Sequence, residues 1–239
     1  MNNEHQLESV EKYGRRYVTE YLASARDRHD TITTTPLAAL NFMYGKLFMR
    51  GRRDAVSVVF RDRTTEVLAQ YKTIQDIDLT ELERQLVAHG VNNRHDRRMV
   101  AESINFARRE LQAYDCNVYA WAVDAIYTGR SATAFAQLDS IHAVGDKLAT
   151  FYLRDVAFLE DLQSNINTDD YVYFQPVDTW VERVALSLNI IDDGDLGHLY
   201  VIKRKIVTQC LAAQVSPLLF NAGSWMVGAH AYRLLLERL

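Results

Sequence analysis

Apolar residues recur along this chain mainly at spacings of three and four, which is the period of an amphipathic helix. Glycine and proline are sparse, with 10 and 3 residues, and the breaks between periodic stretches are short. The pattern therefore predicts an all-α protein. The expected helices cover residues 8–26, 36–48, 53–71, 79–89, 94–114, 118–128, 132–138, 146–163, 178–188, 197–213 and 216–235.

Three short polar residues stand where helices are expected to begin. Thr35 precedes Pro36, Asp78 precedes a periodic stretch, and Ser216 precedes a second proline. A short side-chain acceptor satisfies a free amide of the first helical turn, and proline also fits that turn. These positions are therefore predicted helix starts.

Composition sets the class of the protein. The chain has 239 residues, of which 48% are hydrophobic, and this is enough for one large domain or two small lobes. No apolar run approaches the roughly 18 residues that a membrane span needs, and residues 1–6 do not resemble a secretory signal. We expect a cytoplasmic protein with no membrane partner.

The cysteines and histidines argue against a metal site. Cys116 and Cys210 are far apart and outside any Cys-x-x-Cys pattern, so they cannot build a zinc site or a four-thiolate iron–sulfur cluster. We expect two reduced cysteines packed as small apolar groups. The sequence also lacks a histidine pair at i, i+4 beside a glutamate, so neither a metal nor a cofactor is expected.

The charges are unevenly distributed. The formal net charge of −4 argues against indiscriminate binding to nucleic acid. Basic residues nevertheless gather at positions 50–53, 61–63, 94–98, 108–109 and 203–205. Each cluster is either a solvated helix surface or a set of phosphate contacts. Among the acids, Asp155, Glu160 and Asp161 are expected to be solvated.

Two segments carry the strongest signal for chemistry. Residues 138–149 combine an apolar helix end, a turn with a glycine and a second helix. Residues 175–183 form a short extended run with a proline, followed by another helix. They place Lys147 and Asp178 near the starts of two helices.

Together these segments resemble the helix-hairpin-helix and Gly/Pro-Asp signature of the base-excision DNA glycosylases. That superfamily includes endonuclease III, the 8-oxoguanine glycosylases and the archaeal GO glycosylases. The hairpin of the family usually reads Leu-Pro-Gly-Val-Gly-x-Lys-x-Ala, and its second motif reads Val-Asp-x-His/x-Val-x-Arg. The matching residues in this chain are Val144, Gly145, Lys147, Ala149, Val177, Asp178, Val181 and Arg183.

The chain departs from the family pattern in two places. His142 and Ala143 stand where the family has Pro-Gly, which leaves the geometry of the hairpin open. The interval from Lys147 to Asp178 is 178 − 147 = 31 positions, longer than in endonuclease III and closer to the archaeal GO type. We place the additional residues in the polar run 163–170.

A weaker likeness lies upstream, in residues 86–100. This segment resembles the family's apolar-x-x-x-Gly-Leu-Tyr-Asn-x-Lys-Ala stretch, whose loop wedges into the stacked bases. The resemblance makes Val91, Asn92, Asn93 and Arg94 the gap-filling loop, with 50–53 as a second possibility. It also implies a two-lobed helical fold with a cleft. Residues 36–145 would form one lobe ending in the hairpin, 146–239 the other, and 1–35 would pack on the latter.

The resemblance gives the matched residues their roles. In the hairpin, His142, Val144 and Gly145 would hold DNA phosphate, although an ordinary turn with a solvated lysine is the alternative. Lys147, when neutral, would attack the sugar and give lyase activity. Asp178 would stabilise positive charge on the sugar, although capping its own helix is the alternative.

Aromatic residues near the C-terminus are candidates for the base pocket. Phe220 and Trp225 would stack on the extruded base, and Asn221 would read its edge. Core packing is favoured for each of the two aromatics, because aromatics at helical spacing usually form the interior. A hydrogen bond at a helix start explains Asn221.

The resemblance thus predicts a DNA glycosylase, with lyase activity, that excises a damaged or modified base. Its partner would be DNA carrying 8-oxoguanine or a hypermodified base of phage DNA, and a monomer would suffice for one nucleotide. A non-enzymatic helix-hairpin-helix DNA-binding protein is the first alternative. An all-helical interaction protein that does not bind nucleic acid is the second.

Overall fold

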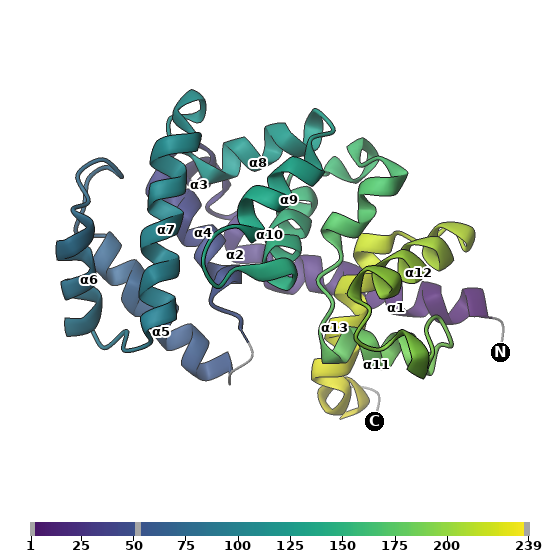
Figure 1. The fold of residues 1–239 in the computed structure, drawn as a ribbon. Coiled ribbons are helices and arrows are strands. Elements are labelled where there is room, and N and C mark those ends of the chain that lie inside the picture. Colours follow the sequence, from purple (N-terminus) through teal and green to yellow (C-terminus); the bar gives the residue numbers. More distant parts are fainter. Residues whose placement is uncertain (1–2, 51–53, 237–239) are drawn as a thin grey trace. The chain divides into compact units, whose positions relative to one another are not determined.

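The computed structural model describes residues 3–50 and 54–236, and within these ranges the protein is all-α, with no strand (Figure 1). Four short 3-10 helices, η1 to η4, join the α-helices. In chain order the elements are α1 (Asn3–Tyr21), α2 (Ala23–Arg26), α3 (His29–Thr34), α4 (Pro36–Leu47), α5 (Asp54–Leu68), α6 (Leu79–Ala88), α7 (Arg94–Glu110), η1 (Gln112–Tyr114), α8 (Val118–Tyr127), α9 (Ser131–Asp139), α10 (Gly145–Leu159), η2 (Leu162–Asn165), η3 (Thr168–Phe174), α11 (Thr179–Ser187), η4 (Asp193–Asp195), α12 (Leu199–Ala212) and α13 (Pro217–Leu236).

Every predicted helical stretch contains a helix, and the predicted stretches differ from the observed helices mainly at their ends. Asp78 caps α6 by accepting from the amide of Glu81 at 2.8 Å, and the Oγ of Ser216 accepts from the amide of Leu219 at 3.3 Å. Pro36 opens α4 as expected, but Thr35 makes no side-chain cap there. Helix α3 was not predicted from the sequence.

The chain divides into two compact units. One comprises residues 25–165, and the other comprises residues 1–24 together with 166–239. The division at 165/166 falls inside the polar run 163–170, where the sequence places its additional residues. Helix α10 belongs to the first unit, whereas the predicted lobe boundary precedes it.

Helix α4 is central to the unit of residues 25–165. It is apolar on nearly every side, as expected of a buried helix, and it packs against α3, α5, α8 and α10. Tyrosine hydroxyls are satisfied by backbone inside this core. Tyr44 donates to the carbonyl of Val100 at 3.3 Å, and Tyr152 donates to that of Val118 at 3.0 Å.

In the second unit, α1 packs against α13, so that the first and last helices of the chain are in contact (Figure 1). Two glycines allow this close approach. A Cβ added at Gly14 would lie 1.9 Å from the carbonyl oxygen of Leu219, and one at Gly223 would lie 2.0 Å from that of Val10. Residues 1–35 were expected to pack on C-terminal helices. Helix α1 does so, whereas α3 packs on α4.

Within the described residues, no helix is long and apolar enough to cross a membrane.

Candidate nucleic-acid site

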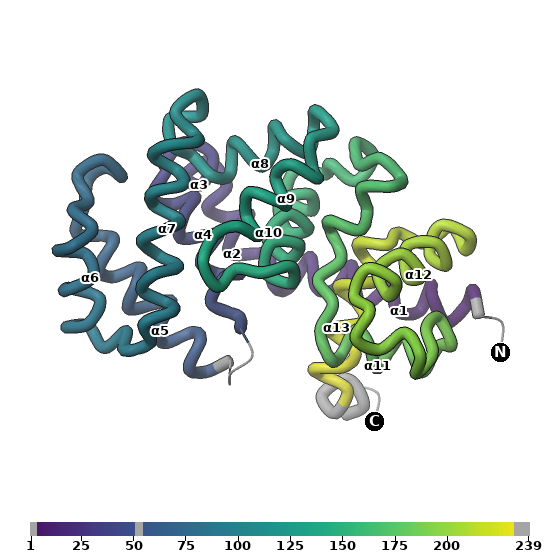
Figure 2. The backbone as a smooth tube through the Cα atoms, in the orientation of Figure 1, coloured from purple at the N-terminus to yellow at the C-terminus, as the bar shows by residue number. Residues whose placement is uncertain are grey.

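The hairpin predicted from the sequence is present as α9, a tight turn and α10, which can be followed in Figure 2. Ala143 and Gly145 both have left-handed backbone, with φ of 62° and 61°. These are the positions of the two glycines in the family motif. The turn therefore keeps a left-handed residue at Ala143 even without glycine, at a cost of about 1–2 kcal/mol for a side chain in this region.

The candidate phosphate contacts of the hairpin differ in exposure. A Cβ added at Gly145 would meet no atom within 4 Å, so this position faces open space. Val144 is buried, and its amide donates to the carbonyl of Ile141 at 3.0 Å. Its part in the turn is therefore to hold the hairpin in place. His142 is half-buried, and its amide donates to Oε2 of Glu102 at 2.7 Å.

The predicted gap-filling loop is a rigid connection between α6 and α7. The guanidinium of Arg97 donates to the carbonyls of Val91 and Asn92, at 3.1 and 2.8 Å. The side chain of Val91 is buried, and the side chain of Asn93 caps α7 by accepting from the amides of residues 95 and 96. This leaves Asn92 and Arg94 as the exposed side chains of the loop.

The first turn of α7, which follows this loop, meets the hairpin within the unit of residues 25–165. Nδ1 of His95, in the first turn of α7, lies 2.9 Å from Nε2 of His142. The two rings are nearly parallel, with centroids 5.2 Å apart and planes 14° from parallel. The structure thus brings together two segments that the resemblance assigns separately to DNA contact. The pairing joins residues 47 positions apart, and no local pattern indicates it.

Lys147 is the third residue of α10 and is half-buried. Phe151 and Arg154 follow at i+4 and i+7, which places all three on one side of the helix. Two cations flank the Phe151 ring. Cζ of Arg154 lies 4.9 Å from its centroid and Nζ of Lys46 lies 5.1 Å from it.

Two of the acids expected to be solvated are paired instead. Asp155 is fully buried, with Oδ2 at 2.5 Å from Nζ of Lys46 and Oδ1 at 2.9 Å from Nη2 of Arg154. Glu160 accepts from the Tyr119 hydroxyl at 2.7 Å and lies 2.5 Å from the His29 ring. The expectation was wrong for both because Lys46, which pairs with Asp155, and Tyr119 and His29, which contact Glu160, come from distant segments. Asp161 is exposed, as predicted.

The basic clusters are also largely occupied by partners. Arg50 pairs with the buried Asp96, Arg63 donates to the carbonyl of Gly90 at 2.9 Å, and Arg98 pairs with Glu102 at 2.7 Å. Residues 51–53 of the first cluster lie outside the described residues. Fewer arginine side chains are therefore available for phosphate than their number in these clusters indicates.

Asp178 caps α11 in the second unit. Its Oδ1 accepts from the amides of Trp180 and Val181, at 3.0 and 3.1 Å. Capping is thus observed for this carboxylate. The backbone before it is held by Asn221, whose Nδ2 donates to the carbonyl of Pro176 at 3.2 Å. Asn221 accordingly supports the Asp178 segment, a role that the sequence did not suggest.

Gln175, three residues before Asp178, is a residue that sequence reasoning missed. It is fully buried, and neither its Nε2 nor its Oε1 has a hydrogen-bond partner among the described residues. Buried amides are almost always satisfied, so this one is an exception that calls for an explanation. Flanking apolar residues are the only sign of its burial in the sequence.

The aromatic candidates for the base pocket are packed into the second unit. Phe220 is fully buried within its hydrophobic core. Trp225 is half-buried and makes edge contacts with three rings, at centroid distances of 5.8, 5.2 and 5.3 Å from Tyr17, Tyr21 and His230. Of the two, Trp225 alone has surface to offer to a base.

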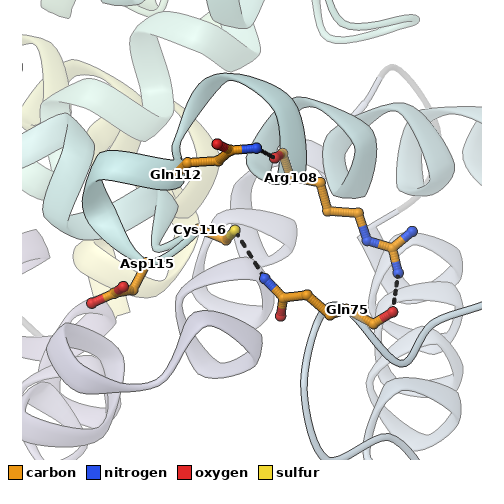
Figure 3. Close-up of a pocket in the computed structure, with 5 residues that line it drawn as sticks. All are labelled: Gln75, Arg108, Gln112, Asp115 and Cys116. Atoms are coloured by element: carbon orange, nitrogen blue, oxygen red, sulfur yellow. Dashed lines mark hydrogen bonds between the residues drawn. The ribbon is translucent and has the colours of Figure 1, made fainter.

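A surface pocket of about 490 Å³ lies at the C-terminal end of α7, away from the predicted site residues. It is lined by Gln75, Arg108, Gln112, Asp115 and Cys116 (Figure 3). Arg108 donates to the backbone carbonyl of Gln75 at 3.1 Å. The side-chain amide of Gln75 donates to Sγ of Cys116 at 3.3 Å. These bonds fix the loop before α6.

The described residues include no group of three or more histidine, cysteine, aspartate or glutamate side chains that could hold a metal ion. Cys116 and Cys210 are free and buried, and burial raises the pKa of the Cys210 thiol. Comparison with known proteins found no matching family model, curated protein or solved structure.

Proposed function

We propose that this protein is a DNA glycosylase with lyase activity, built on the two-lobed helix-hairpin-helix fold of the base-excision superfamily, that excises a damaged or modified base. The observation that carries the proposal is the hairpin. Its turn keeps left-handed backbone at Ala143 and Gly145, and Lys147 follows in the first turn of α10. The contact between the hairpin and the first turn of α7 adds support.

In the proposed reaction, the neutral amine of Lys147 attacks C1′ of the extruded nucleotide. The new N–C1′ bond replaces the bond from C1′ to the base, whose electron pair leaves with the base as it takes up a proton. Opening of the sugar ring gives a Schiff base. Loss of a C2′ proton then breaks the C3′–O bond by β-elimination. Asp178 would stabilise the positive charge that develops on the sugar.

Base flipping requires a group to fill the gap in the duplex. Asn92 and Arg94 are the loop side chains exposed for this role, because Val91 is buried and Asn93 caps α7. The substrate classes proposed for the excised base are 8-oxoguanine and a hypermodified base of phage DNA.

The proposal is tested with duplexes that each carry one modified base, assayed for abasic-site formation. Asp178→Asn is the informative variant, because asparagine caps a helix about as well as aspartate but lacks its charge. We expect loss of base release with DNA affinity nearly unchanged. Asp78→Asn, at the cap of α6, is the matched control and should retain activity. Normal turnover in Asp178→Asn would refute the role of this carboxylate.

A second function is favoured by one observation, the pair of hydrogen bonds in which Asp178 caps α11. If capping is the only role of Asp178, the chain is a non-enzymatic helix-hairpin-helix DNA-binding protein. This alternative predicts salt-sensitive DNA binding without base release on any duplex of the panel.

A further inference from the structure

The hydrogen-bonded pair of His95 and His142 is the feature that goes beyond the resemblance. The hairpin position of His142 is proline in the family motif, and the pairing with His95 cannot be read from either motif. His95 is exposed and His142 is half-buried, so both rings are accessible from outside. They join the start of α7 to the turn before α10.

The separation of 2.9 Å between Nδ1 of His95 and Nε2 of His142 limits the protons that the pair can hold. A hydrogen bond between two ring nitrogens needs one donor and one acceptor. A pair with both rings protonated presents two N–H groups to each other and has to separate. The observed geometry therefore fits a pair in which at least one ring is neutral.

The charges around the pair favour this state. Burial lowers the pKa of His142, and its neighbours Arg98, His95 and Arg50 lower it further, against the opposing effect of Glu102. Arg98 is itself paired with Glu102, and Arg50 with Asp96. These groups come from α7 and from the segment that follows α4. In the free protein they disfavour a proton on His142.

We propose that His95 and His142 bind a phosphodiester of the DNA backbone, and that binding takes up a proton at this pair. The anion offsets the repulsion from the neighbouring arginines and allows both rings to carry a proton. Each ring then donates a charge-assisted hydrogen bond to a phosphate oxygen in place of the bond to its neighbour. The inference rests on the proposed function, since it assumes that this surface faces DNA.

The direction of the pH dependence follows from this linkage. In the free protein the pKa of His142 lies below the usual histidine value of 6.5. In the proposed complex the bound phosphate raises this pKa. DNA affinity therefore falls as pH rises from the His142 pKa of the free protein to that of the complex. Uptake of one proton changes the affinity by at most about tenfold per pH unit.

The test is fluorescence anisotropy with a short labelled duplex that carries a tetrahydrofuran abasic-site analogue, at constant ionic strength from about pH 6 to pH 8. We expect wild-type affinity to fall with rising pH within that window, by at most about tenfold per pH unit. His95→Gln and His142→Gln keep a hydrogen-bonding side chain but cannot titrate, and each should flatten the slope. The exposed His198, on the other unit, provides the control His198→Gln, which should keep the wild-type slope.

The outcomes separate this inference from the proposed function. DNA binding whose pH slope is flat in the wild type, or unchanged in both pair variants, overturns the histidine site and leaves the glycosylase proposal standing. Base release by a protein whose DNA affinity does not depend on pH likewise overturns the histidine site alone. Absence of binding at every pH overturns both.

Discussion

Oε2 of Glu102 accepts a hydrogen bond of 2.7 Å from the backbone amide of His142. Oε1 of the same carboxylate accepts from Nε of Arg98, also at 2.7 Å. One acid on α7 thus fixes the hairpin turn through its backbone and leaves the His142 ring to pair with His95. The hairpin is therefore positioned by a carboxylate that becomes protonated at low pH.

Glu102 should make the stability of the protein depend on pH in the acid range. Burial opposes ionisation of Glu102, but hydrogen bonds from Arg98 and from the His142 amide outweigh it, and the pKa of this carboxyl lies below its usual 4.5. A lowered pKa contributes stability that is present above pH 4.5 and is lost as pH falls through the folded-state value. Urea unfolding over this range should show a smaller loss in Glu102→Gln than in the wild type. Equal losses would show that this contact does not stabilise the fold.

Ala143→Gly should stabilise the protein by about 1 kcal/mol, because alanine at this left-handed position carries a strain that glycine does not. Ala136→Gly is the matched control in α9, at an exposed position, and should destabilise by about 0.5–1 kcal/mol. Urea denaturation measures both. A loss of stability in Ala143→Gly similar to that of the control would mean that the turn is not strained.

Gly223→Ala should destabilise the second unit, since the added methyl group meets the backbone of α1 at Val10. Overpacking of this kind typically costs about 1–3 kcal/mol. Gly45→Ala is the control, because a Cβ there meets no atom within 4 Å. Thermal unfolding should show a lower midpoint for Gly223→Ala alone. An unchanged midpoint would contradict the close packing of α1 on α13.

Gln175→Met removes an amide that is buried without a hydrogen-bond partner among the described residues, and it nearly preserves the volume of the side chain. An unsatisfied buried polar group costs about 1–3 kcal/mol, so the variant should be at least as stable as the wild type. Chemical denaturation is the measurement. A clear loss of stability would mean that the amide is satisfied in solution, for example by a bound water molecule.

Much of the fold could be predicted from local pattern, and most of what was missed depends on distant partners. Helices with strong apolar periodicity and caps such as Asp78 were found, because both signals lie within a few residues. Helix α3 was missed, since its sequence His-Asp-Thr-Ile-Thr-Thr is rich in β-branched residues that disfavour helix. Tertiary packing against α4 overrides that preference.

The same distinction holds for the candidate site. The hairpin and the cap at Asp178 follow from residues close in sequence, so motifs locate them. The burial of Asp155 depends on Lys46, which lies more than a hundred positions away, and the role of Asn221 depends on Pro176. Only the folded chain brings these pairs together, and a single sequence carries no local sign of them.

The central claim is that Lys147 forms a covalent bond to DNA, and borohydride reduction tests it most directly. A duplex carrying a modified base that the protein releases is incubated with the protein and reduced, and the cross-linked species is separated on a denaturing gel. We predict a trapped complex for the wild type and for the exposed-lysine control Lys72→Gln, and none for Lys147→Gln. Trapping that persists in Lys147→Gln, or base release by a wild type that is never trapped, would contradict the assignment of this lysine.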